Sequence, residues 1–183
     1  MKDELTDGRV RLRRYRDEDV QALFAAATES IDHMRPWMPW CHKGYTMEES
    51  RQWVEINPVN WGKGSAYDFV IEDASTAAFV GGCGLNDIDL RNKRANLGYW
   101  VRASRIGEGF APAATLLLAR WALEELALRR VEILVAVGNS RSLRVAEKVG
   151  ATREGILRNR LVLCDETHDA VMHSLIPADL GLI

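Results

Sequence analysis

A glycine-rich turn between a predicted strand and a predicted helix is well suited to bind an anion. The turn runs from Ile106 to Ala111 and contains Gly107 and Gly109. Glycine has no Cβ, so a ligand can approach the backbone N–H groups closely. The first helical turn adds about four unpaired N–H donors and the positive end of the helix dipole. The pattern predicts a phosphate or pyrophosphate site, although glycines before a helix also occur in plain tight connections.

Three ligand classes can be tested against this turn. A P-loop requires Gly-Lys-Ser/Thr, and no such tripeptide follows. A dinucleotide fingerprint requires a third glycine at the position of Pro112. An acyl-coenzyme A fits, because its pyrophosphate arm needs such an array of donors.

A second polar pair lies at the start of a later predicted helix. Asn139 and Ser142 are three residues apart there. Both residue types commonly cap helices, and both can also contact a ligand or donate a proton. Capping and a functional role are therefore equal alternatives for this pair.

The predicted elements follow the order β-α-α-β-β-β-α-β-α-β-β. Strands are expected at 9–15, 67–71, 77–85, 96–101, 131–137, 156–163 and 169–176, and helices from 16 onward, over 47–61, 110–128 and 139–150. The first strand is expected near a sheet edge, and Pro58 is expected to end the second helix early. Residues 31–46 are expected to form an irregular aromatic segment.

The motifs around the glycine turn resemble those of one superfamily. Tyr99-Trp100-Val101, seven further residues and then Gly109-Phe110-Ala111 are similar to the coenzyme A signature of the GNAT N-acetyltransferases. That signature reads Gln/Arg-x-x-Gly-x-Gly/Ala, and its first position here is Ile106. The stretch from Asn139 to Gly150 resembles the second motif of the superfamily. The stretch 36–40, Pro-Trp-Met-Pro-Trp, resembles the ribosomal-protein (RimJ/RimL-type) branch.

The resemblance implies a fold and a co-substrate. The fold class is α/β (α+β), a single GNAT-type domain over residues 1–183 with a mixed, mostly antiparallel central sheet flanked by helices. The co-substrate is acetyl-CoA. Its expected contacts are Trp100, Val101, Arg102, Ile106, Gly107, Glu108, Gly109, Phe110, Ala111, Asn139 and Arg141.

The resemblance also implies a reaction, the attack of a neutral amine on the acetyl thioester. Many members place a tyrosine acid where this chain has Ala146, so Ser142 is expected to protonate the thiolate, with Asn139 beside the pantetheine arm. The backbone N–H of Val101 is a candidate oxyanion donor. The acceptor pocket is expected at Trp37, Trp40 and Tyr99. Candidate bases are Asp87, Asp89, Glu72, His173 or an ordered water chain.

Composition narrows the surroundings of this chemistry. The 183 residues carry a net charge of −2, which predicts no nucleic-acid or anionic-membrane partner. No apolar leader or membrane-length run is present, and three distant cysteines do not indicate a disulfide framework, so a cytoplasmic protein is expected. No metal is expected, because the histidines lack ligand spacing with the cysteines. A homodimer is implied by the resemblance alone.

Several acceptors remain open at this point. The preferred one is a protein N-terminal amine, and the alternatives are small amines such as a polyamine, an amino acid or an antibiotic. A non-catalytic acyl-CoA sensor is the alternative of another class, because Ile106 and Ala146 depart from the family pattern. An oxidoreductase is a distant third.

Overall fold

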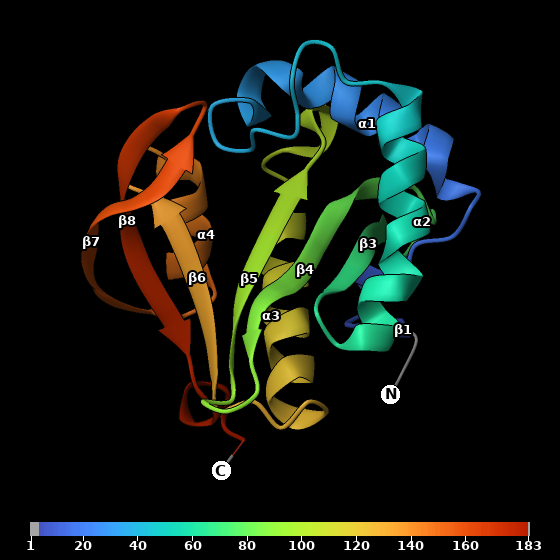
Figure 1. Ribbon diagram of the computed structural model, residues 1–183. Coiled ribbons are helices and arrows are strands. Elements are labelled where there is room, and N and C mark those ends of the chain that lie inside the picture. The colour runs from blue at the N-terminus through green and yellow to red at the C-terminus, as the bar shows by residue number, and fades with distance from the viewer. Residues whose placement is uncertain (1–3, 183) are drawn as a thin grey trace.

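The structure is a computed structural model that describes residues 4–182, and it is organised around one eight-stranded sheet (Figure 1). The strand order is β1-β2-β3-β4-β5-β6-β8-β7. The strands are β1 (Glu4–Thr6), β2 (Val10–Arg13), β3 (Tyr67–Asp73), β4 (Phe79–Asp89), β5 (Arg94–Val101), β6 (Arg130–Ala136), β7 (Thr152–Leu163) and β8 (Glu166–Leu175). Among the described strands, only β5 and β6 pair in parallel, which confirms the predicted mixed, mostly antiparallel sheet.

Helices cover both faces of this sheet. They are α1 (Asp19–Met34), α2 (Met47–Lys63), α3 (Phe110–Glu124) and α4 (Ser140–Lys148), with short 3-10 helices η1 (Ala103–Arg105) and η2 (Pro177–Leu180). In Figure 1, α3 and α4 lie behind the sheet, whereas α2 crosses in front and α1 lies across the top. The larger apolar core forms between the sheet and α3, where Phe69, Leu97 and Leu118 are buried. A smaller core joins α1 and α2 to the other face through Leu23, Val54 and other buried side chains.

One local prediction is confirmed and another is wrong. Strand β2 lies near the sheet edge, with the three-residue strand β1 outside it. Helix α2 continues through Pro58 to Lys63. The proline lies on an exposed face, and the helix is held at both ends: Thr46 and Glu49 form a capping box, and Gly64 closes it in a left-handed conformation. These interactions offset the hydrogen bond that proline cannot make.

The two parallel strands separate soon after they meet. Pairing between β5 and β6 extends only from Arg94–Arg130 to Asn96–Glu132. Figure 1 shows the strands diverging from there. The N–H of Arg102 donates to Val80 on β4, and successive N–H groups point to opposite edges of a strand. The N–H of Val101 therefore points toward the open side, away from β4.

Candidate active site

One cavity of about 570 Å³ lies where β5, α3 and α4 come together. Its walls include the glycine turn and the first turns of both helices. The residues predicted to contact the cofactor that line it are Trp100, Val101, Ile106, Gly107, Gly109, Phe110, Ala111, Asn139 and Arg141. We call this cavity the cofactor groove.

The glycine turn exposes backbone donors to this groove. Gly107 and Gly109 have φ angles of +88° and +83°, a region that other residues enter only with strain. Gly109 precedes the first residue of α3, and no side chain caps that helix. The first N–H groups of α3 are therefore left for an anion.

The charges beside the turn are arranged in two groups. Arg105 pairs with Glu108 at 2.9 Å and with Asp73 at 2.8 Å, so the acidic side chain next to the turn is neutralised. Bonds from Ser75 and Arg105 hold the pKa of Asp73 well below its usual range. The second group, Arg141, Arg144 and Lys148 of α4, lines the groove itself. These cations supply the positive charge that is missing at Ile106, where the coenzyme A signature has Gln or Arg.

Three predicted site residues lie elsewhere than expected. The Arg102 side chain pairs with Glu29 of α1, whose pKa falls to about 2 through that bond, and it does not line the groove. Glu108 is likewise outside the lining. Trp37 lines the cofactor groove against Gly138, whereas Trp40 lines a second cavity.

The hydroxyls of Tyr99 and Ser142 meet at 2.8 Å. Tyr99 lines both cavities, and burial raises its pKa to about 12, so the phenol keeps its proton at neutral pH. Asn139 accepts a hydrogen bond from the N–H of Ser142 at 3.1 Å, which is the capping arrangement. The same hydroxyl pair thus lies at the junction of the two cavities.

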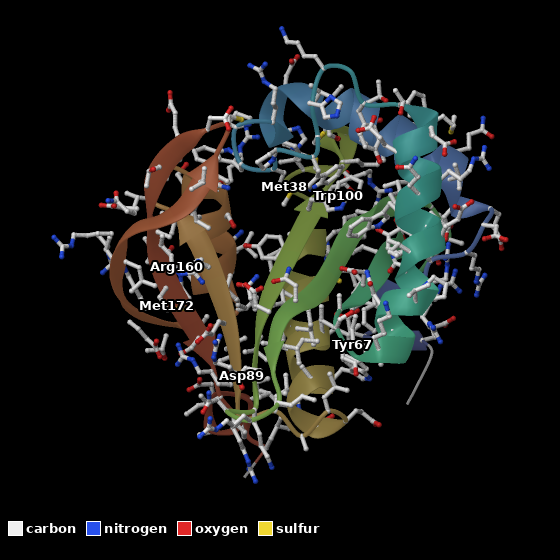
Figure 2. All side chains as sticks on the ribbon, in the orientation of Figure 1. Met38, Tyr67, Asp89, Trp100, Arg160 and Met172 are labelled. Atoms are coloured by element: carbon white, nitrogen blue, oxygen red, sulfur yellow. The ribbon has the colours of Figure 1, made fainter. Side chains whose placement is uncertain are left out.

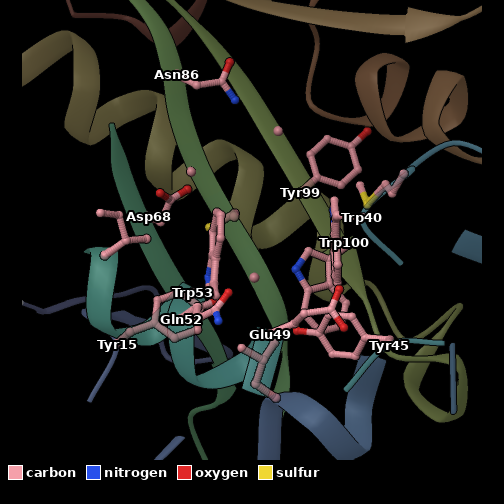
Figure 3. A pocket seen from close by; sticks show the side chains of 17 residues that line it. Tyr15, Trp40, Tyr45, Glu49, Gln52, Trp53, Asp68, Asn86, Tyr99 and Trp100 are labelled. Atoms are coloured by element: carbon pink, nitrogen blue, oxygen red, sulfur yellow. The ribbon is translucent and has the colours of Figure 1, made fainter. Parts of the chain in front are cut away.

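The second cavity, of about 700 Å³, lies between the sheet and helices α1 and α2. Aromatic side chains form most of its wall: Tyr15, Trp40, Tyr45, Trp53, Tyr99 and Trp100. Trp40 packs edge-on against Trp100 with the ring centroids 5.6 Å apart, and Tyr15 packs in the same way against Trp53 with the centroids 6.4 Å apart. We call this cavity the aromatic pocket (Figure 3).

Asp68 is the residue of this pocket that the sequence analysis missed. It lies on β3 opposite Gly84 of β4, and burial raises its pKa to about 7. Within residues 4–182 its carboxylate has no hydrogen-bond or ion-pair partner. A Cβ on Gly84 would lie 2.0 Å from Asp68 Oδ1, so the carboxylate extends over the glycine. An aspartate directly before the apolar run 69–71 was the available signal.

None of the four predicted candidates for a side-chain base lines either cavity. Glu72 is buried in an ion-pair network with Arg11 and Arg13. His173 is buried on β8, where burial lowers its pKa. Asp89 lies at the end of the sheet opposite Trp100, as Figure 2 shows, and Asp87 is close to it in β4.

Residues 4–182 contain neither a metal-binding cluster nor a membrane-spanning helix. No cluster of three or more histidine, cysteine, aspartate or glutamate side chains could hold a metal ion. Among the same residues, no helix has the length and apolarity needed to cross a bilayer.

The chain resembles known proteins in sequence and in fold. Residues 9–152 match the model of the acetyltransferase (GNAT) domain. The Bacillus subtilis protein YdaF, whose name assigns it provisionally to ribosomal N-acetyltransferases, is 35% identical over 69% of this chain. That alignment spans 63% of YdaF, so the chain covers less than two thirds of this relative.

Solved structures agree with the sequence matches. A Vibrio cholerae protein, provisionally described as a ribosomal-protein-serine acetyltransferase, superposes with a TM-score of 0.84 at 27% identity, over 97% of this chain and 100% of the other. RimL, a ribosomal L7/L12 alpha-N-protein acetyltransferase solved with coenzyme A, gives a TM-score of 0.84 at 25% identity, over 94% of this chain and 96% of the RimL chain. These matches confirm the predicted fold, RimJ/RimL likeness and acetyl-CoA-dependent enzyme class. The chain belongs to the GNAT acetyltransferase family.

Proposed function

We propose that this protein transfers the acetyl group of acetyl-CoA to a primary amine in a ternary complex, with a protein N-terminal amine as the preferred acceptor. The observation that carries the proposal is the meeting of two cavities at Tyr99, beside the opening between β5 and β6. One cavity offers donors for a pyrophosphate, and the other offers an aromatic chamber for the acceptor. RimL, an alpha-N-protein acetyltransferase, supports the choice of acceptor.

The cofactor residues divide by the part of acetyl-CoA that they would bind. The N–H groups of Gly107 to Ala111 would bind the pyrophosphate, with Arg141 and Arg144 adding charge. The open edge of β5 and Asn139 would contact the pantetheine arm. Trp37 and Ile106 would contribute apolar contacts to the groove wall. Arg102 and Glu108 would act indirectly, by holding α1 and Arg105 in place.

The transfer needs an oxyanion donor and a proton for the departing sulfur. The amine nitrogen forms a bond to the thioester carbon, and the oxyanion is stabilised by the outward-facing N–H of Val101. The C–S bond then breaks, and Ser142 gives its proton to the thiolate. Tyr99, bonded to Ser142 at 2.8 Å, reprotonates the serine.

Calorimetry followed by turnover assays tests this proposal. Titration with acetyl-CoA should give micromolar binding, and titration with NADH should give no signal. Peptides with a free Ser, Thr or Ala N-terminus should then release CoA, whereas N-terminally blocked peptides should not. Acetyl-CoA binding without turnover on any peptide or small amine would contradict the enzyme and favour an acyl-CoA sensor.

Cellular context forms a second part of the proposal. We place the protein in the cytoplasm because its cysteines are free and Cys164 is an exposed thiol. We also propose a homodimer, supported by the exposed apolar Ile156, Leu157 and Val162 of the edge strand β7. A net charge of −2 supports the absence of nucleic-acid and membrane partners. Analytical ultracentrifugation tests the dimer.

A further inference from the structure

The aromatic pocket contains acids but no basic side chain. Glu49 of α2 and Asp68 of β3 line it, and no Lys, Arg or His is among its lining residues. Figure 3 shows Asp68 on the Tyr15 side of the pocket and Glu49 on the Tyr45 side. Aromatic faces attract cations, and a carboxylate adds a full opposite charge. This chamber is therefore suited to an organic cation and unsuited to a carboxylate.

Glycines form the floor on which a ligand would lie. Asp68 is in register with Gly84 of β4, and Gly84 is in register with Gly98 of β5. A Cβ on Gly98 would meet no atom within 4 Å, so the floor is open toward β5. One strand spacing is about 4.8 Å. The row forms a shallow channel that leads from the Asp68 carboxylate toward Tyr99, where the two cavities meet.

A second glycine holds the aromatic wall close to this floor. A Cβ on Gly82 would lie 2.6 Å from the Tyr15 hydroxyl and 2.8 Å from Trp100 Nε1. Both rings consequently cover the backbone of β4 itself. Larger residues at positions 82 and 84 would push the rings and the carboxylate into the cavity. Gly82 and Gly84 of β4 are thus explained by the pocket that they form.

The ionisable groups around Asp68 leave it free to accept a proton. Tyr15 and Cys83 lie near it, and burial together with the Asp68 charge raises the pKa of both, so both stay protonated. Tyr45 and Tyr99 also keep their protons, because burial raises their pKa values. Bonds from Thr46 and His42 lower the pKa of Glu49, which therefore remains an anion. At neutral pH, Asp68 is the group in this chamber that exchanges a proton.

We infer that the acceptor is an ammonium ion with an apolar or aromatic body and no carboxylate next to the amine, and that Asp68 takes its proton. This inference rests on the proposed function and narrows its substrate class. The ammonium N–H proton passes to an Asp68 oxygen, and the freed lone pair attacks the thioester carbon. Sulfur leaves with the proton from Ser142, and the second proton that the nitrogen loses as the amide forms restores the Ser142–Tyr99 pair. Free amino acids are disfavoured because their carboxylate would enter an acidic chamber, whereas a peptide N-terminus bears no such charge.

Binding without chemistry tests the cation preference first. Phenyltrimethylammonium cannot be acetylated, and phenylacetate is its anionic counterpart. The cation should quench the tryptophan fluorescence of the pocket and bind at least about tenfold more tightly than the anion. Equal binding of the two probes would overturn the inference. Because no acetyl transfer is involved, this result stands apart from success or failure of the proposed enzyme.

Turnover then tests the role of Asp68. Phenethylamine and phenylalanine amide should be acetylated at least about tenfold more efficiently than phenylalanine. Asp68→Asn should lower kcat/KM about 100-fold, remove the rise in rate with an inflection near pH 7, and leave acetyl-CoA affinity unchanged. The matched control is Glu55→Gln, a change at an exposed position of α2 that does not line the pocket. An unchanged pH profile in Asp68→Asn would overturn the assignment, whereas an enzyme inactive on every amine would contradict the proposed function instead.

Discussion

The cofactor groove and the aromatic pocket meet at Tyr99 but are built by different means. The groove depends on main-chain groups: a glycine turn, two helix N-termini and the open edge of β5. The pocket depends on side chains brought together from α1, α2, β3, β4 and β5 over a floor without side chains. Such construction predicts that donor binding and acceptor binding can be damaged separately, and substitutions in each cavity test this separation.

The largest effect is expected from Gly84→Ala. The new Cβ would lie 2.0 Å from Asp68 Oδ1, so the carboxylate must leave its position over the floor. A misplaced catalytic group costs about 100-fold in rate, and kcat/KM for the amine should fall by that factor. Acetyl-CoA affinity, measured by calorimetry, should not change. Gly62→Ala on the exposed surface of α2 is the control, and equal losses in donor and acceptor binding would contradict the separation.

Ser142→Ala should affect the junction of the two cavities. Loss of the proton donor should lower kcat about 30-fold, less than a complete loss of general acid catalysis because the Tyr99 hydroxyl remains nearby. Steady-state rates should show an unchanged KM for the amine. Tyr99→Phe should lower kcat by a smaller factor. The double variant should raise the activation free energy by less than the sum of the two single variants, because the two hydroxyls act together. Strict additivity would refute the relay.

Burial of Asp68 should make the free energy of unfolding depend on pH. Its pKa is about 7 in the folded chain and near 3.9 in an unfolded chain, so proton binding favours the folded state. That stabilisation is complete below about pH 4 and is lost as the pH rises through 7. The free energy of unfolding of Asp68→Asn, relative to the parent, should therefore increase by about 2 kcal/mol from pH 5 to pH 8. A difference independent of pH in urea titrations would contradict the burial.

The smallest effect is expected from charge removal in the groove. Arg141→Ala combined with Arg144→Ala should weaken acetyl-CoA binding about tenfold, since exposed cations contribute modestly beside the backbone donors. The loss should shrink as salt is raised, because ions screen exposed charges. Arg120→Ala on α3, outside both cavities, is the control. A loss of amine affinity alone would reverse the assignment of the two cavities.

The groove was more predictable from sequence than the pocket, because its signals are local. Gly107, Gly109 and the start of α4 at Asn139 stand in short motifs, and the structure places them in one cavity. Trp37 and Trp40 show where local reasoning fails: they are three residues apart and face different cavities. An irregular segment has no fixed periodicity from which side-chain direction can be inferred.

Asp68 could not be assigned because its role depends on strand register. The aspartate, Gly84 and Gly98 lie in one row only when three strands pair as they do here, and a slip by one residue would turn each to the other face. The prediction that Pro58 ends α2 early was wrong for another reason. It considers the proline alone, whereas the cap at Thr46 and the closure at Gly64 stabilise the helix from its two ends.

The short pairing between β5 and β6 has a mechanical consequence. Among the described residues, the strand pairing between β1–β5 and the β6-β8-β7 segment of the sheet consists of three residue pairs, Arg94–Asn96 with Arg130–Glu132, and the N–H of Arg129 adds one bond to Lys93. Hydrogen exchange should thus reveal two cooperative units that open with different free energies. A donor molecule lying across the divergence would cross-link them, so the amides on both sides should slow together when acetyl-CoA is bound.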